Sequence, residues 1–164
     1  MRKEKMEIGS YLPNTPVQQL VDGQVLQINL AEFSAGKTII LVSVPGAFTP
    51  TCSEDHVPDY LSNISAFWDK GVDEIVILAS NDFFVVKAWA DQLTVNKYFQ
   101  FMADGSQKFA GAAGQLLDLT EIGLGMRSQR YAALVRDGQV EQISIEPDAT
   151  AVSVSSAAAM LQQI

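Results

Sequence analysis

The chain has 164 residues, of which 48% are hydrophobic and 18% are charged, and its net charge is −8 with a pI near 4.5. This composition is typical of a folded globular protein, and the acidic balance argues against nucleic acid or an anionic membrane surface as a partner. The length favours a single domain over residues 1–164, and no repeat, linker or membrane-length apolar run interrupts it.

Strand and helix patterns alternate through the first part of the chain. Strands are expected at Val25–Leu30, Thr38–Val44, Glu74–Ala79, Gln100–Ala103, Arg130–Arg136 and Val140–Ile145. Helices are expected at Thr51–Lys70, Phe83–Leu93, Gln107–Ala112 and Ser155–Gln163. The segment from 38 to 93 forms a βαβα unit, whose near-continuous apolar strands suit a sheet covered on both faces.

The last two strands are separated by Asp137-Gly138, which favours a tight hairpin because this pair adopts the positive φ angles that the turn needs. A parallel βαβ unit, an antiparallel hairpin and a C-terminal helix predict an α/β protein. The expected architecture is a thioredoxin-like fold with a central mixed β-sheet flanked by helices.

Cys52 is the only cysteine, and it lies in the stretch PGAFTPTCS (45–53) just after the expected strand Thr38–Val44. In the first turn of a helix it meets unpaired N–H groups and the positive end of the helix dipole, which favour the thiolate. A lone cysteine can also be an inert small hydrophobe. Because the loop offers few side chains to pack against the thiol, we expect Cys52 to be an accessible nucleophile at the carboxyl end of a central strand.

Two neighbours of Cys52 carry chemistry or rigidity. The Thr49 hydroxyl can accept a hydrogen bond from a protonated oxygen and donate one to the sulfur, although a turn or helix-capping role is also open. Pro45 has a fixed φ and no N–H, so we expect it to stiffen the pocket and to shield the thiolate from water.

A positive charge is needed to hold the sulfur as an anion, and Arg127 and Arg130 precede the hairpin. An arginine presents a planar fork of donors that suits a thiolate and a peroxide oxygen, although a solvated surface charge is the ordinary role. Arg130 begins a strand and is expected to point inward, whereas Arg127 is expected in the preceding loop.

His56 follows Cys52 by four residues, so both side chains can project from one helical face. A Cys–His nucleophile pair of the cysteine peptidase kind is therefore conceivable. A substrate beyond the helix N-terminus is poorly placed for such a pair. We expect His56 to order the local helix or a subunit contact instead.

Several classes of site are excluded or unsupported. One cysteine excludes an internal disulfide and, with a single histidine, a Cys/His zinc site. No nucleotide-binding glycine motif occurs, so we expect no cofactor and no metal. The charged N-terminus is not followed by an apolar signal segment, and a free thiol suits a reducing compartment, so a cytoplasmic location is expected.

The chain resembles the peroxiredoxins, thiol peroxidases of thioredoxin-like fold, because Pro45, Thr49 and Cys52 match their active-site signature. It is similar in particular to the peroxiredoxin-five subfamily. That similarity rests on the sequences PGAF (45–48), CSEDHVP (52–58), RSQRY (127–131), DG (137–138) and IEPD (145–148).

The resemblance implies that Cys52 attacks the peroxide O–O bond, that Thr49 and Arg130 bind and polarise the two oxygens, and that Pro45 walls off the pocket. Arg127 would be a nearby support. Relatives form homodimers through a face near the active-site loop, so a homodimer is expected.

One departure from the family pattern sets the catalytic cycle. Some subfamily members carry a resolving cysteine after the Glu-Pro-Asp stretch, where this chain has Val154. The resemblance therefore implies a one-cysteine cycle through a Cys52 sulfenic acid and a mixed disulfide with an external thiol. Glutathione with glutaredoxin is the reductant that the resemblance suggests, and thioredoxin is the alternative.

Two other functions use the same features. Cys52 could belong to a peroxide-sensing thiol switch or a redox-regulated binding protein, in which a partner reads a single oxidation event. A purely structural thioredoxin-like module is the third option, and the loop around Cys52 argues against it. An enzyme consumes many equivalents of peroxide per thiol, whereas a sensor consumes one.

Overall fold

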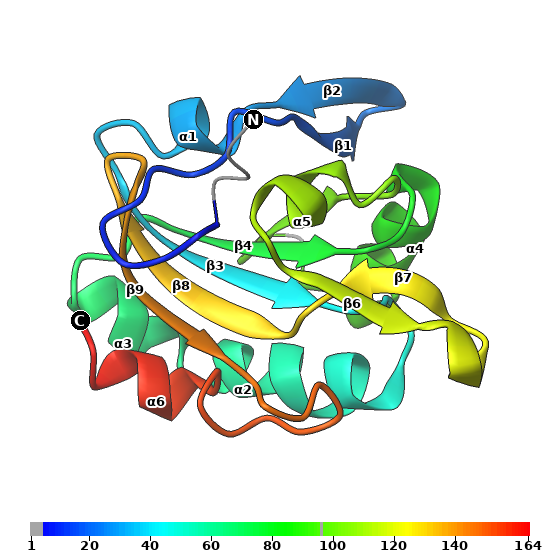
Figure 1. The fold of residues 1–164 in the computed structure, drawn as a ribbon. Coiled ribbons are helices and arrows are strands. Elements are labelled where there is room, and N and C mark those ends of the chain that lie inside the picture. The colour runs from blue at the N-terminus through cyan, green and yellow to red at the C-terminus, as the bar shows by residue number, and fades with distance from the viewer. Residues whose placement is uncertain (1–4, 96) are drawn as a thin grey trace.

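The computed structural model describes residues 5–95 and 97–164, which form an α/β fold around a mixed sheet (Figure 1). The strands are β1 (Val17–Val21), β2 (Gln24–Ile28), β3 (Thr38–Val44), β4 (Glu74–Ala79), β5 (Gln100–Ala103), β6 (Leu116–Leu119), β7 (Gly125–Ser128), β8 (Tyr131–Arg136) and β9 (Gln139–Ile145). The helices are α1 (Leu30–Phe33), the π-helix η1 (Thr51–His56), α2 (Val57–Ser62), α3 (Ile64–Asp69), α4 (Phe83–Leu93), α5 (Lys108–Ala112), the 3-10 turn η2 (Thr120–Ile122) and α6 (Ala157–Leu161).

Seven strands form the main sheet in the order β2-β1-β5-β4-β3-β8-β9, and β6 pairs with β7 in a separate hairpin. Strands β3, β4 and β5 are parallel, whereas β8 pairs antiparallel with β3, and β9 pairs antiparallel with β8 at the edge. The predicted thioredoxin-like arrangement of a central mixed sheet with flanking helices is therefore confirmed. Figure 1 shows α2, α3 and α6 on one face of the sheet and α1 and α5 on the other.

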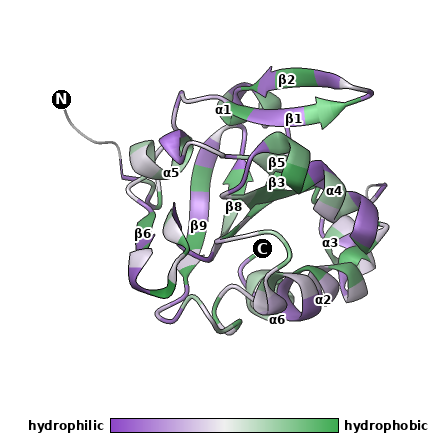
Figure 2. Ribbon diagram, turned by 90° about the vertical axis from the view of Figure 1, so that its right-hand side faces the viewer, coloured by the Kyte–Doolittle hydropathy of each residue, from purple (hydrophilic) through white to green (hydrophobic). Residues whose placement is uncertain are grey.

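Both faces of the central strands are buried, as the apolar runs predict. In β3, Ile40 and Val42 face the apolar cluster that packs against α2 and α4, while Ile39 and Leu41 face the opposite cluster. Figure 2 shows the edge strand β9 banded in hydrophilic and hydrophobic colours, as expected where one face meets solvent. Burial on two sides holds the carboxyl end of β3 in place, and the chain leaves β3 there to enter the Cys52 loop.

Four predicted elements have their predicted bounds. Strands Thr38–Val44, Glu74–Ala79 and Gln100–Ala103 and helix Phe83–Leu93 match the structure at both ends. The hairpin turn also forms as predicted, because Asp137 and Gly138 have φ angles of 50° and 80°.

Other expectations need correction. The strand expected at Arg130–Arg136 begins one residue later, at Tyr131, so Arg130 lies directly before β8. The helix expected at Ser155–Gln163 is shorter, because Ser156 caps α6 with its side chain and the helix runs from Ala157 to Leu161.

The strand expected at Val25–Leu30 ends at Ile28, because Asn29 caps a short helix with its side chain and Leu30 begins that helix. Strand β1, helix α1 and the β6–β7 hairpin were not expected from the pattern. Strand β1 has the sequence VQQLV, and its two glutamines interrupt the apolar run that is typical of a central strand.

The helix expected at Thr51–Lys70 is not continuous. It begins with the π-helix η1, in which the N–H of Val57 bonds to the carbonyl of Cys52 five residues earlier. Pro58 follows and has no N–H to offer a regular turn. Asn63 then separates α2 from α3, and its side chain donates to the carbonyl of Asp59, so it competes with the helix for that acceptor.

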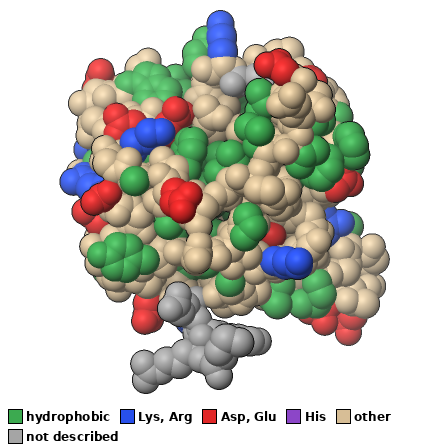
Figure 3. All heavy atoms as spheres, turned by 90° about the horizontal axis from the view of Figure 1, so that it is seen from above, with side chains coloured by type: hydrophobic (Ala, Val, Ile, Leu, Met, Phe, Trp, Pro, Cys, Tyr) green, Lys and Arg blue, Asp and Glu red, His purple; other side chains and the backbone are tan. Residues whose placement is uncertain are grey.

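The surface carries charge without a concentrated basic region on the face seen in Figure 3, where acidic and basic side chains lie scattered between hydrophobic ones. Within residues 5–95 and 97–164, no helix is long and apolar enough to cross a membrane.

Candidate active site

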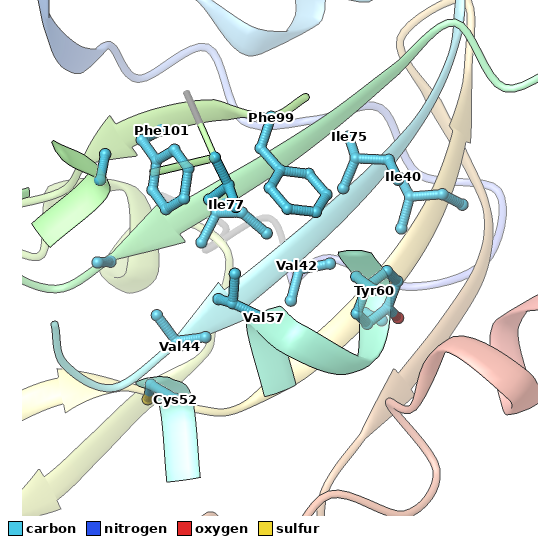
Figure 4. Close-up of a cluster of buried hydrophobic side chains, with 14 of the residues drawn as sticks. Ile40, Val42, Val44, Cys52, Val57, Tyr60, Ile75, Ile77, Phe99 and Phe101 are labelled. Atoms are coloured by element: carbon cyan, nitrogen blue, oxygen red, sulfur yellow. The ribbon is translucent and has the colours of Figure 1, made fainter. Parts of the chain in front are cut away.

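The candidate site lies where β3 ends and the chain turns into η1. Cys52 is in the first turn of this helical segment, as predicted. The expectation of an accessible thiol is wrong, however, because Cys52 has an exposed fraction of 0% and belongs to the apolar cluster of Val44 and Val57 (Figure 4). The loop has few large side chains, but the end of β3 and the helix itself close over the sulfur.

Arg130 meets this buried sulfur directly. Its Nη2–H donates to the Sγ of Cys52 at 2.9 Å, and the arginine is only 2% exposed. Among the residues that the structure describes, no carboxylate forms a salt bridge with Arg130. The Arg130 guanidinium is therefore the charged group placed to stabilise negative charge at the position of the sulfur.

His56 holds the other side of the same guanidinium. Arg130 Nη1–H donates to Nδ1 of His56 at 2.8 Å, so the second ring nitrogen, Nε2, donates to the carbonyl of Ser155 at 3.1 Å. Burial and then the charge of Arg130 lower the pKa of His56 from 6.5 to about 4, so the ring is neutral at pH 7. His56 therefore orients Arg130 and orders the local structure, and it makes no hydrogen bond to Cys52.

The C-terminal segment, residues 146–155, holds Arg130 and His56 in place through its backbone carbonyls. The carbonyl of Ala149 accepts from Nε–H of Arg130 at 2.8 Å, and the carbonyl of Ser155 accepts from the Tyr60 hydroxyl as well as from His56. The buried Glu146 carboxylate accepts hydrogen bonds from the backbone and hydroxyls of residues 153 and 155. Burial raises the pKa of Glu146, but these hydrogen bonds outweigh burial and hold the pKa at about 2.

Thr49 lies at the entrance of the helical segment, where its carbonyl accepts from the N–H of Ser53 at 2.9 Å. Its hydroxyl donates to the carbonyl of Gly46 at 2.8 Å. A hydroxyl has one proton, so the predicted donation to the sulfur is not what the structure shows. The oxygen keeps its lone pairs, and the predicted ability to accept from a protonated oxygen is retained.

Pro45 and Arg127 meet on the other side of the loop. Pro45 is buried directly after β3, and its carbonyl accepts from Nη1–H of Arg127 at 3.2 Å, beside the carbonyl of Ser80 at 3.3 Å. The expectation that Arg127 lies in a loop is wrong, because it is in strand β7, whose partner strand β6 is missed by the sequence pattern. Arg127 contacts backbone carbonyls and makes no hydrogen bond to Cys52.

Asn81 is a contact residue that the sequence reasoning missed. Its Oδ1 accepts from the N–H of Ala47 at 2.8 Å. The contact joins two loops that each follow a parallel strand, β3 and β4. Since carboxyl ends of parallel strands meet at one edge of a sheet, the polar Ser80-Asn81-Asp82 stretch after β4 was the available signal.

In the described part of the chain, no group of three or more histidine, cysteine, aspartate or glutamate side chains is arranged to hold a metal ion. The guanidinium of Arg130 bonds the sulfur, the neutral imidazole of His56 orients that guanidinium, and the Thr49 hydroxyl lies in the loop that leads to Cys52. This set can bind a small neutral molecule with oxygen donors and acceptors, and it can stabilise negative charge on that molecule.

Comparison with known proteins agrees with this chemistry. The Redoxin family model matches residues 7–161. The chain is 39% identical over 163 residues to the chloroplastic peroxiredoxin-2E of Arabidopsis thaliana, covering 97% of this chain and 69% of that protein.

Solved structures are also similar. Reduced Prx3 from Vibrio vulnificus in complex with hydrogen peroxide has a TM-score of 0.89 and 37% identity, with 96% of this chain and 98% of that chain covered. The 1-Cys peroxiredoxin of Plasmodium falciparum has a TM-score of 0.90 and 27% identity, with the same coverage.

The chain belongs to the Redoxin family and, within it, to the peroxiredoxins. It is a thiol-dependent peroxidase. The predicted family, fold and enzyme class are thereby confirmed.

Proposed function

We propose that Cys52 is the peroxidatic cysteine of a one-cysteine cycle, with hydrogen peroxide and alkyl hydroperoxides as substrates. The observation that carries the proposal is the 2.9 Å contact between Nη2 of Arg130 and Sγ of Cys52. Three of the five guanidinium N–H groups bond to Cys52, His56 and the Ala149 carbonyl, which leaves one N–H on each terminal nitrogen for a peroxide oxygen.

The first step is an in-line displacement on the peroxide. The Cys52 thiolate attacks one oxygen, a sulfur–oxygen bond forms and the O–O bond breaks, so sulfur is oxidised and the peroxide oxygens are reduced. The remaining N–H groups of Arg130 stabilise the charge that grows on the departing oxygen, which leaves as water or an alcohol after it takes a proton. Thr49 accepts a hydrogen bond from the protonated oxygen, and Pro45 excludes water from the pocket.

The second half of the cycle uses external thiols. A first thiol attacks the Cys52 sulfenic acid, so a disulfide forms and water leaves, and a second thiol then releases the Cys52 thiol. The position of Val154 and the single cysteine support an external donor over an internal one. We favour glutathione with glutaredoxin as the donor and take thioredoxin as the alternative.

A turnover experiment separates this enzyme from a peroxide-sensing switch or a redox-regulated binding protein. Peroxide consumption is followed with glutathione and glutaredoxin, and in parallel with thioredoxin and its reductase. The expected result is many equivalents of peroxide consumed per Cys52 with one donor system, and none above background for Cys52→Ser. Consumption that stops at one equivalent with both systems would favour the sensor.

A homodimer is proposed for the face beside the active-site loop. The hydrogen bond from Ala47 to Asn81 brings the loop to the start of α4, and the one from Arg127 to Pro45 brings β7 to the same loop. Exposed apolar side chains lie on these three segments or, for Leu124, directly before β7: Phe48, Phe84, Leu124 and Met126. Sedimentation velocity should give a dimer at micromolar concentration, and a monomer throughout would reject the proposal.

We further propose the cytoplasm as the place of action, because a single cysteine that needs external thiols suits a compartment rich in reduced glutathione. Fractionation of cells that produce the full chain tests this assignment, and recovery in another compartment would overturn it.

A further inference from the structure

The peptide unit between Gly46 and Ala47 is held at both of its polar ends by side chains. Its N–H donates to Oδ1 of Asn81 at 2.8 Å, and its carbonyl accepts from the Thr49 hydroxyl at 2.8 Å. The N–H and C=O of a trans peptide point in opposite directions within one rigid plane. The hydrogen bonds to Asn81 and from Thr49 therefore hold this plane at its two opposite edges.

The fixed orientation of this peptide determines whether the Thr49 hydroxyl acts as a donor or as an acceptor toward a substrate. Its single proton is committed to the Gly46 carbonyl, so its oxygen can only accept a further hydrogen bond. A peroxide that approaches Cys52 carries an O–H to donate. If the peptide rotated, the carbonyl would move away and the hydroxyl would be free to turn its proton toward the substrate or the sulfur.

We propose that Asn81 is a positioning residue of the peroxidase site, which acts on Thr49 through the 46–47 peptide and keeps the hydroxyl an acceptor for the peroxide. This inference rests on the proposed role of Thr49. Hydrogen bonds in a chain also polarise one another, so the bond from Ala47 to Asn81 strengthens the carbonyl as an acceptor for Thr49.

The loop needs such an anchor because its own conformation is strained. Phe48 has a φ of 63°, in the left-handed region that a residue with a large side chain rarely adopts. Gly46 is crowded as well, since a Cβ there would lie 3.1 Å from Nη1 of Arg127 and 3.3 Å from Cγ2 of Thr49. A strained loop relaxes unless contacts from outside hold it.

Asn81 is itself fixed to the rigid part of the fold. It lies two residues after Ala79, the last residue of the buried strand β4. Gly105 packs behind this segment, because a Cβ on Gly105 would lie 3.0 Å from Cα of Asp82 and 3.4 Å from the carbonyl oxygen of Asn81. The hydrogen bond from Ala47 to Asn81 therefore ties the loop of residues 45–49 to the end of β4.

The test compares variants by the second-order rate constant for oxidation of Cys52 by hydrogen peroxide. Asn81→Leu removes the acceptor at similar size and should lower the rate constant about tenfold, the effect of losing one part-buried hydrogen bond. Asn81→Asp keeps an oxygen at the same place and should recover most of the rate. Asp82→Ala is the matched control, because it removes the side-chain cap of α4, lowers thermal stability and leaves the bond from Ala47 to Asn81 in place.

A double-mutant cycle with Thr49→Val shows whether Asn81 acts through Thr49. In the Thr49→Val background, Asn81→Leu should have little further effect. Multiplied effects, an unchanged rate in Asn81→Leu, or an equal loss in Asp82→Ala would each overturn the proposal. If Thr49→Val alone keeps the full rate, the proposed role of Thr49 fails with it, whereas a slow Thr49→Val beside a normal Asn81→Leu refutes only the role of Asn81.

Discussion

The residues around Cys52 come from two regions of the chain that offer different chemistry. The loop region, residues 45–49 with Asn81 and Arg127, is an arrangement of backbone peptides held by two donors, Thr49 and Arg127, and by the acceptor Asn81, and it presents the Thr49 oxygen as an acceptor. The strand region, Arg130 with His56 and the C-terminal segment behind them, presents a buried positive charge. In the proposed mechanism one region orients the substrate and the other stabilises negative charge, so mutations should separate the two tasks.

The largest effect is expected in the strand region. Arg130→Met removes the donor to Sγ and the N–H groups proposed for the peroxide, so the rate constant for peroxide should fall on the order of 100-fold or more. Arg130→Lys keeps the charge but cannot make the three contacts of a planar fork at once, and should recover only part of the loss. Stopped-flow oxidation of Cys52 measures both variants.

A smaller effect is expected when the orientation of Arg130 is disturbed. His56→Asn removes the ring nitrogen that accepts from Nη1, and the rate constant should fall about tenfold while Arg130 and Cys52 remain in place. A rate equal to that of the parent protein would mean that Ala149 alone orients the guanidinium.

The same variant has a signature in the pH dependence of stability. The pKa of His56 is lowered to about 4 in the folded protein, so between pH 6.5 and 4 the unfolded chain binds a proton that the folded protein does not. The free energy of unfolding should therefore fall as pH drops through this window, by at most about 3 kcal/mol. The protein has one histidine, so His56→Asn should flatten this part of a urea-denaturation series.

Glu146 provides the contrast at lower pH. Its pKa is about 2 against an ordinary 4.5, so its contribution is present above pH 4.5 and is lost as pH falls toward 2. A His56→Asn protein should keep this second decline. A slope that is unchanged between pH 6.5 and 4 would contradict the neutral, buried state of His56.

The smallest effect is expected for Arg127→Met, in the loop region. Arg127 donates to the carbonyls of Pro45 and Ser80 at 3.2 and 3.3 Å and makes no hydrogen bond to Cys52. Loss of these bonds should lower the peroxide rate only a few-fold, at about 1 kcal/mol for a hydrogen bond of this kind. A loss equal to that of Arg130→Met would erase the distinction between the two arginines.

The sequence was sufficient for the features that depend on local pattern. The buried strands β3 and β4, helix α4 and the Asp137-Gly138 hairpin all follow from apolar runs and turn residues. The position of Cys52 at the end of a central strand follows from the same pattern. Arg130 was assigned as the inward arginine because it was expected to begin a strand. Its contact with Sγ confirms that it points inward, although strand β8 begins one residue later, at Tyr131.

Tertiary contacts decide what the pattern could not predict. Burial of Cys52 comes from the closure of η1 over the end of β3. The π-helix η1 leads directly into α2, whose first turn contains Pro58. Asn81 is 34 residues from its partner Ala47, and Ser155 is 99 residues from His56. The polar stretch after β4 could place Asn81 at the right edge of the sheet but could not name its partner, and the contact of His56 with Ser155 has no signature in a single sequence because these residues meet only after the sheet has formed.

The most direct test compares two reactions of Cys52 in two variants. Oxidation by hydrogen peroxide needs both regions, whereas alkylation by iodoacetamide needs the anionic sulfur but no acceptor for a peroxide proton. We predict that Arg130→Met slows both reactions and that Thr49→Val slows only the peroxide reaction. Equal slowing of both reactions by both variants would contradict the division of tasks between the two regions.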